Sequence, residues 1–253
     1  MSRWIRKQVP TILGLLILIV AWQVFVIITH IKSYLLPSPI EVLRALTDMR
    51  WRWHEQVLVT TIEVIGGFAL SAVIGIFLGM AIAWSDLSRR VIMPFIVFLN
   101  SLPKIAMAPL FIIWLGYGII PNIWIAFLCA FFPITINSAT GVTEIEPDMV
   151  DLARSLRVPK WKIFLKIRIP NALPYIFTGL KISATMAVVG AVVGEFIAST
   201  RGLASVIMSA QASLSTHAIF AALIWISALG LVLFGVISGL ERLFMPWAYL
   251  QKG

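Results

Sequence analysis

Cysteine and the common catalytic and nucleotide-binding motifs are scarce or missing in this 253-residue sequence. Its one cysteine, Cys129, permits neither an intrachain disulfide nor a cysteine cluster. No Gly-x-x-x-x-Gly-Lys-Ser/Thr segment occurs, so any ATP must bind to another polypeptide. Gly-x-Ser-x-Gly and His-Glu-x-x-His are absent too. We therefore predict no catalytic residue, cofactor site or metal site, and interpret His30, His54 and His217 as polar residues at a membrane interface.

Charged residues are also few, at 12%, whereas 60% of the residues are hydrophobic and the mean hydropathy is +0.97. Soluble domains contain about 45–50% apolar residues. The composition therefore predicts an all-α, polytopic membrane protein, because a helix of about 20 apolar residues crosses about 30 Å of hydrocarbon. Six segments are long enough, namely residues 9–31, 57–84, 91–115, 119–138, 172–198 and 218–240.

The distribution of Lys and Arg predicts the orientation of these six spans. An even number of spans puts both termini on one side. With the termini inside, the inside segments carry thirteen Lys and Arg residues and the outside segments five, as the positive-inside rule requires. We therefore predict cytoplasmic termini. The net charge of +9 then reflects loops that face a lipid membrane, so no nucleic acid is expected as a partner.

A charged insertion, residues 144–170, separates two long apolar runs. It carries six basic and four acidic residues: Arg154, Arg157, Lys160, Lys162, Lys166, Arg168, Glu144, Glu146, Asp148 and Asp151. So polar a segment between membrane spans indicates a soluble partner on the cytoplasmic side.

The insertion resembles the cytoplasmic loop of membrane subunits of bacterial ATP-binding-cassette (ABC) importers. That loop follows the pattern Glu-Ala-Ala, three residues, Gly, nine residues, Ile, any residue, Leu-Pro. Here Asp151 stands for the Glu, Ile167 for the Ile and Ile169-Pro170 for the Leu-Pro, with the spacing kept. Two positions differ in kind, because Leu152 replaces an Ala and Arg157 replaces the Gly.

Arg157 matters because glycine adopts a positive φ at little cost, whereas arginine must avoid that conformation or be strained by it. Pro159 offers an alternative turn, since proline suits the start of a following helix, expected over residues 160–167.

Other segments resemble the same importers, so the resemblance covers about residues 36–245. The segment from Asn100 to Gly116 resembles the third span of the family. The nitrate, sulfonate and taurine branch is resembled by Leu36-Pro37-Ser38-Pro39, by the segment from Glu195 to Ala204, and by the last span through Leu240-Glu241-Arg242. The resemblance implies a type I importer permease fold, with one membrane domain over residues 1–253. It also implies an outer interfacial segment (36–56) and a cytoplasmic coupling loop (144–170). In the first of these, residues 40–49 carry apolar residues at helical spacing, and Trp51 and Trp53 follow, as expected of a short helix at the outer interface.

The resemblance further implies the partners and the coupling residues. A permease homodimer would work in the inner membrane with two ATPase subunits, which bind ATP and Mg, and with a solute-binding protein. The residues that dock on the ATPase would be Asp151, Leu152, Ala153, Arg154, Ser155, Leu156, Arg157, Val158 and Pro159. Leu152 and Leu156 are four residues apart and so share one helix face.

Four charged residues fall within the expected spans, where an ionised group costs about 2.5–3.5 kcal/mol on insertion scales. Glu63 and Lys181 lie nearer the span ends, which favours interfacial contact. Lys104 and Glu195 are predicted to pair or to line a polar pathway. The span that carries Lys104 is interrupted by Pro94, Pro103 and Pro109, which favours a kinked helix that lines a cavity. Asn100 and Ser101 lie in this span and are therefore also predicted to line the pathway.

Small residues recur at every fourth position in two spans, where they allow another helix to approach closely. The second span carries Gly67, Ser71, Gly75, Gly79 and Ala83, and the fifth carries Gly179, Ser183, Ala187 and Ala191. Three roles stay open for these stripes. They would pack against another helix of the same chain, form surfaces along which helices slide, or contact a second copy of the chain. Gly235 and Gly239 in the sixth span are predicted to pack within the chain.

Two alternatives stay open from sequence. An ion-coupled secondary transporter is disfavoured because the spans lack an acidic proton or sodium relay. An integral-membrane enzyme is disfavoured because no catalytic constellation is recognisable. Among importers, the solute is open between nitrate, sulfonate or taurine and a pyrimidine or riboflavin-type vitamin precursor.

Overall fold

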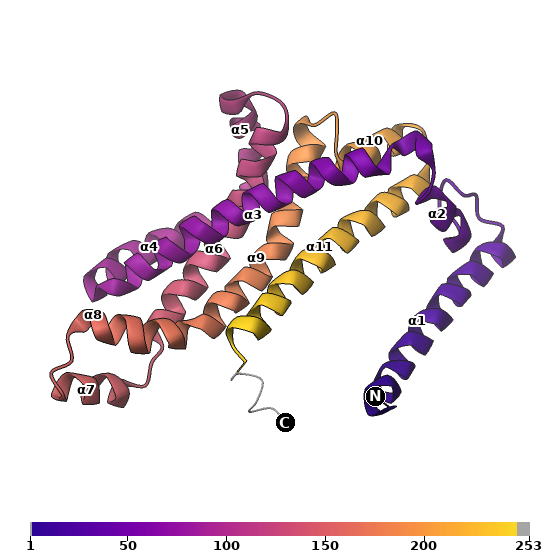
Figure 1. Cartoon of the computed structure of the whole chain (residues 1–253). Helices are drawn as coiled ribbons and strands as arrows, with labels where there is room; N and C mark the ends of the chain where they lie inside the picture. Colours follow the sequence, from indigo (N-terminus) through magenta and orange to yellow (C-terminus); the bar gives the residue numbers. More distant parts are fainter. Residues whose placement is uncertain (1, 247–253) are drawn as a thin grey trace.

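The computed structural model describes residues 2–246, apart from the side chains of residues 2–9, 11, 12, 86, 147 and 198. Within that range the regular structure is helical throughout, with no strand, and Figure 1 shows its arrangement. The helices are α1 (Ser2–Thr29), α2 (Pro39–Ala45), η1 (Met49–Trp51), α3 (Trp53–Trp84), α4 (Asp86–Ser101), η2 (Lys104–Met107), α5 (Ala108–Leu115), α6 (Ile119–Thr143), α7 (Pro147–Ser155), α8 (Lys160–Ile163), η3 (Phe164–Arg168), α9 (Ile169–Ala198), α10 (Leu203–Ala212) and α11 (Thr216–Phe244).

Four helical stretches are long and apolar enough to cross a membrane: α3, α6, the continuous stretch from α8 to α9, and α11. The pair formed by α4 and α5 makes a fifth candidate if it is taken as one bent span. The described apolar part of α1, Leu13–Thr29, is shorter. The prediction of an all-α polytopic membrane protein is confirmed, and the count of six spans stays a prediction.

The third span is broken, as its prolines predict. The axis turns by 81° between Leu87–Ser101 and Lys104–Leu115. Pro103 disfavours helical geometry at the residue before it, and Leu102 accordingly has an extended ψ of 140°. A short 3₁₀ turn then leads into α5, where Pro109 occupies the first turn and costs no helical hydrogen bond. Two short helices therefore replace one straight span.

The central contact of the fold is that α6 packs along both α3 and α9. A Cβ on Gly67 of α3 would lie 2.5 Å from Cβ of Ala126, and one on Gly79 would lie 2.6 Å from Cβ of Ser138. On the other side, a Cβ on Gly179 of α9, a member of the predicted stripe, would lie 2.9 Å from Cβ of Asn137. One on Gly190, outside the stripe, would lie 2.7 Å from Cα of Ala126. The predicted small-residue stripes thus seat α3 and α9 on α6 within one chain.

Buried hydroxyl groups add hydrogen bonds across these close contacts. Ser71 of α3 donates to the carbonyl oxygen of Phe127 at 2.9 Å, and Ser183 of α9 donates to that of Ala130 at 2.6 Å. Both serines are fully buried. Such bonds between transmembrane helices contribute about 0.6 kcal/mol on average, so they reinforce the packing that the small residues permit.

The expectation for the last span is wrong. Nothing lies within 4 Å of where a Cβ would stand on Gly235 or Gly239 of α11. The neighbouring Leu231, Val232 and Val236 are exposed, because this face of α11 points away from the other helices. The two glycines are therefore not packing positions within the chain.

The segment after α1 forms a short helix as predicted, but it ends at Ala45 rather than Met49. Ser38 caps α2 and Glu41 bonds back to the Ser38 N–H at 2.8 Å, a capping box. This hydrogen bond lowers the pKa of the Glu41 carboxyl. Trp53, expected at an outer interface, is instead buried and donates to the carbonyl oxygen of Ala45 at 2.8 Å.

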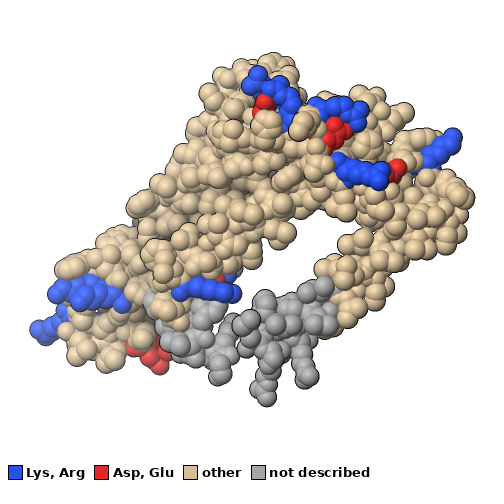
Figure 2. Space-filling view, turned by 45° about the vertical axis from the view of Figure 1, so that its right-hand side comes forward, with Lys and Arg blue, Asp and Glu red and all other residues tan. Residues whose placement is uncertain are grey.

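Charged side chains gather at two opposite ends of the molecule in Figure 2, with a broad uncharged band between them. The helix α7 lies at one end, whereas α2, α5 and α10 lie at the other (Figure 1). The described part of α1 begins on the side of the molecule where α7 lies, and α11 ends on that same side (Figure 1). Residues 247–253, including the predicted cytoplasmic C-terminus, and the side chains of Arg3, Arg6 and Lys7 lie outside the described residues.

The close packing of α3 on α6 predicts the effect of enlarging a glycine. Gly79→Val should destabilise the protein by about 1–3 kcal/mol, because the new side chain meets the Thr135 and Ser138 region of α6. Gly235→Val is the matched control and should behave as wild type. The buried Cys129 provides the readout, as the temperature at which a thiol-reactive dye labels it. Equal midpoints for the two variants would contradict this account of the helix contact.

Candidate functional site

The helix α7 of the charged insertion has one buried and one exposed face. Val150 and Ala153 are buried against the rest of the chain. Met149, Leu152 and Leu156 are 56%, 63% and 70% exposed. Three large apolar side chains on one face of a short polar helix leave a surface that a partner would cover. This surface, defined by Met149, Leu152 and Leu156, is called the α7 apolar face below.

Arg157 adopts the left-handed conformation that its glycine-like position demands, with φ of 56°. The turn is a Schellman-type helix end, because the N–H of Val158 donates to the carbonyl oxygen of Ala153 at 3.0 Å. Pro159 does not replace this turn. It is extended, with φ of −65° and ψ of 145°, and immediately precedes α8 at Lys160. The predicted helix start is thus confirmed, while Arg157 carries a strain of about 1 kcal/mol.

The beginning of the insertion is tied to α9 by polar contacts. The side chain of Asn171 donates to the carbonyl oxygen of Glu144 at 2.8 Å. The hydroxyl of Tyr175 donates to Oε2 of Glu144 at 2.9 Å. These bonds hold the segment that leaves α6 against the first turns of α9.

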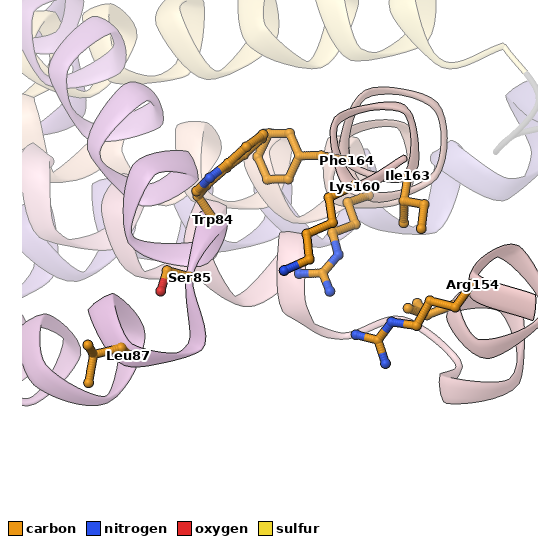
Figure 3. A pocket seen from close by; sticks show the side chains of 9 residues that line it. Trp84, Ser85, Leu87, Arg154, Lys160, Ile163 and Phe164 are labelled. Atoms are coloured by element: carbon orange, nitrogen blue, oxygen red, sulfur yellow. The ribbon is translucent and has the colours of Figure 1, made fainter. Parts of the chain in front are cut away.

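A groove of about 410 Å³ separates α7 from the corner between α3 and α4 (Figure 3). Its lining is Trp84, Ser85, Leu87, Val150, Arg154, Lys160, Ile163, Phe164 and Arg168. The rings of Trp84 and Phe164 meet edge to face, with centroids 4.7 Å apart. This contact joins the end of α3 to the helix that follows α7, so a shift of the insertion reaches α3 directly.

The ion pair on α7 is weak support for that helix. Arg154 and Asp151 approach to 3.2 Å, but both side chains are about two-thirds exposed, at 65% and 68%. Solvent screens such pairs, which contribute about 0.2–1 kcal/mol. In Figure 3 the side chains of Arg154 and Lys160 point toward the same space beside the α3 corner, so the groove is basic.

Lys104 binds within its own segment. Its Nζ donates to the carbonyl oxygen of Asn100 at 2.7 Å and to Oδ1 of Asn100 at 3.0 Å. The ammonium also lies 5.2 Å from the centroid of the Phe132 ring. Ser101 is exposed and donates to the carbonyl oxygen of Val97 at 3.1 Å. The structure thus brings Lys104 and Asn100 together at the bend between α4 and α5.

Glu195 lies elsewhere, and the suggested pairing with Lys104 is not formed. Its carboxyl accepts hydrogen bonds from the Thr60 hydroxyl at 2.5 Å and from the Ala204 N–H at 2.6 Å. The side chain is buried, with 1% exposure. Of the four residues predicted to line a pathway, only Asn100 and Lys104 are in contact with each other, and the pathway role of all four stays a prediction.

The structure corrects the interfacial placement of Glu63 and gives Lys181 a partner. Glu63 is fully buried and accepts a hydrogen bond from Asn122 of α6 at 2.9 Å. Lys181 forms an ion pair with Glu241 of α11, a partner that the sequence analysis did not identify. Glu63 is covered by neighbouring helices, whereas the Lys181 side chain stays 24% exposed, so its interfacial placement stays a prediction. The sequence did carry a signal for the pair of Lys181 and Glu241, because their opposite charges lie on separate spans.

Metal ligation finds no support in the described side chains, because no group of three or more His, Cys, Asp and Glu residues is arranged to hold an ion. His54 approaches Glu55 at 3.6 Å, while Glu55 also pairs with Arg52. These contacts fit polar residues at the end of a span.

Comparison with known proteins adds a family assignment to this geometry. The family described as binding-protein-dependent transport system inner membrane component matches residues 71–246. Formylaminopyrimidine transport permease protein ThiX of Halalkalibacterium halodurans is 31% identical over 99% of this chain and 100% of its own length. Riboflavin transport system permease protein RibX of Chloroflexus aurantiacus is 32% identical, covering 92% and 88%. The putative aliphatic sulfonates transport permease protein SsuC of Bacillus subtilis is 28% identical, covering 98% and 92%.

The strained turn after α7 predicts opposite effects of two substitutions. Arg157→Gly should relieve up to about 1 kcal/mol of strain and slow hydrogen exchange at the Val158 amide by up to about fivefold. Arg157→Val should speed that exchange, because a β-branched residue tolerates positive φ poorly. Mass spectrometry with fragment resolution gives the rates. Faster exchange in the glycine variant than in wild type would be incompatible with strain at this turn.

Proposed function

This chain belongs to the family of binding-protein-dependent transport system inner membrane components, and from that premise we propose that it forms the solute pathway of an ATP-driven ABC importer. It is a membrane permease subunit rather than an enzyme. The observation that carries the proposal is the family match over residues 71–246, which includes the charged insertion and its exposed α7 apolar face. Solute would cross by alternating access, without chemical change.

The proposed partner at the α7 apolar face is the ATPase subunit. Burying a leucine side chain yields about 1.5–3 kcal/mol, and Leu152 and Leu156 present two such side chains side by side. The partner would carry ATP and Mg, since this sequence has no phosphate-binding loop of the Walker type. Two ATPase subunits and a permease homodimer would complete the membrane complex, with α7 and both chain termini in the cytoplasm.

The groove of Figure 3 suggests how ATPase closure would reach the spans. Displacing α7 presses on the α3 corner through Trp84 and Phe164, whose rings already touch. The Glu144 contacts to Asn171 and Tyr175 transmit the same displacement to α9. Both routes end on helices that are seated on α6, so the docked loop would move these three helices together.

The bend between α4 and α5 is the proposed wall of the pathway. Asn100, Ser101 and Lys104 lie at this bend, where a non-helical backbone at membrane depth needs protein or water to satisfy its polar groups. The extracytoplasmic binding protein would deliver solute to the opposite end of the molecule, near the segment of residues 36–56.

A nitrogen heterocycle, such as a pyrimidine or flavin-type precursor, is the solute class we favour. The relatives at 31% and 32% identity are named for formylaminopyrimidine and riboflavin transport. Lys104, the cation at this bend, already binds Asn100 and lies over Phe132, so it is not free to select an anionic solute. The second candidate is a sulfonate, for which the 28% identical relative is named.

Reconstitution tests the transport class and the solute together. In vesicles containing the chain, its ATPase and a solute-binding protein, uptake should require ATP and should be competed by pyrimidines rather than by sulfonates. Competition by taurine or an alkyl sulfonate would select the second solute class. Uptake that needs no ATPase and follows a proton or sodium gradient would instead support a secondary transporter.

The α7 apolar face predicts a docking defect from one substitution. Leu152→Glu should weaken ATPase binding at least tenfold, because it removes about 1.5–3 kcal/mol of burial. Leu243→Glu is the matched control, since Leu243 is 74% exposed and lies near the end of α11, away from α7 and the groove. Substitution of Ala153 is avoided because that residue is buried within the chain. Binding of the purified ATPase to nanodiscs gives the affinity, and equal affinity of both variants would count against docking through this face.

A further inference from the structure

Two buried carboxyl groups meet near the end of the bundle opposite α7. Glu63 of α3 is 0% exposed and Glu195 of α9 is 1% exposed. Shared neighbours link them. Thr60, one turn before Glu63 on α3, donates to Glu195. Asn122, which donates to Glu63, lies against Gly194, the residue before Glu195. Two glutamates at this depth are unusual in a membrane domain, because ionised groups there are costly and normally paired.

The partners of Glu195 are those of an ionised carboxylate. One oxygen accepts from the Thr60 hydroxyl at 2.5 Å and the other from the Ala204 N–H at 2.6 Å. Ala204 lies in the first turn of α10, whose free N–H groups and dipole favour a negative charge. Thr60 in turn accepts from the Leu203 N–H at 2.9 Å.

The partners of Glu63 leave one oxygen without a donor. Its Oε1 accepts from Nδ2 of Asn122 at 2.9 Å. Its Oε2 is buried and has neither an N–H nor an O–H partner, and the same holds for Oδ1 of Asn122. Two buried oxygens without a donor cost about 1–3 kcal/mol each. A proton on Glu63 would give its carboxyl an O–H donor for a neighbouring oxygen.

No basic side chain neutralises the pair among the described residues. The ion pairs of α3 at this end join Arg52 and His54 to Glu55. The sequence of α10 has no charged residue and that of α6 only the thiol of Cys129 as a titratable group. Arg201, in the loop before α10, is exposed, and Lys181 of α9 is paired with Glu241.

The packing leaves no room for a hydrated ion. A Cβ on Gly202 would lie 2.3 Å from Cδ of Glu195, and one on Gly194 would lie 2.5 Å from Oδ1 of Asn122. Gly202 itself has φ of 105°, a conformation that favours glycine. A proton needs no such space, and it removes one of two like charges that would otherwise be buried together.

We propose that Glu63 and Glu195 form a proton-binding site, with the proton carried by Glu63 and the negative charge by Glu195. The proton comes from water when this end of the molecule closes, and it returns to water when Glu63 becomes exposed. The site clamps α3, α6 and α9 to the start of α10, because Gln56 and Thr60 also accept from the N–H groups of Gly202 and Leu203. It is independent of which solute is carried.

Infrared spectroscopy of the whole protein in lipid tests the proposal. Wild type should show the carbonyl stretch of a protonated, water-shielded carboxylic acid, and Glu63→Gln should lose it. Glu241→Gln is the matched control and should retain the band, since Glu241 is a buried carboxylate paired with Lys181. Absence of the band in wild type, or its persistence in Glu63→Gln, would overturn the proposal.

A second measurement separates loss of the proton from general damage. The melting temperature of wild type should fall as the pH is raised from mildly acidic into the alkaline range, because the folded state keeps a proton that the unfolded chain has already released. Glu63→Gln keeps the hydrogen-bonding shape without the charge, so its melting temperature should fall less. An equal fall in both proteins would contradict the assignment of the proton to Glu63. Neither measurement uses transport, so failure here is distinguishable from failure of the importer assignment.

Discussion

The approach of α3 and α9 to opposite sides of α6 is the constraint on which the other features depend. Lipid provides no hydrophobic driving force between helices, so tight contact requires small residues. Gly67, Gly79 and Gly190 supply that contact, because a Cβ at each would lie under 3 Å from atoms of α6. The three helices therefore form one packed unit, and α4 and α5 pack beside it with a bend of 81° between them.

This packed unit has a polar attachment at each end. At one end, α3 finishes at Trp84 beside the groove, and α9 begins with Asn171 and Tyr175, which hold Glu144. At the other end, the same two helices contribute Glu63 and Glu195 to the buried carboxyl pair. Under the proposed function, a displacement of α7 would therefore act on the same two helices that carry the carboxyl pair at the far end.

Features written in local sequence were predictable, and features that depend on neighbouring helices were not. The apolar runs, the broken third span and the start of α8 follow from hydrophobicity and proline chemistry. The burial of Glu63 and its contact with Asn122 depend on a helix that is distant in sequence. The same limit explains why Gly235 was expected to pack, since the sequence shows a small residue without showing which face it occupies.

The central claim is that α3, α6 and α9 move as one body when the ATPase closes. Spin labels at Val73 of α3 and Val189 of α9, two exposed positions, measure the distance between these helices in a Cys129→Ala background. In the complex with the ATPase, the distance between the two labels within one chain should stay the same with and without ATP, while the distance between labels on different copies changes. A change within the chain as large as that between copies would contradict the claim.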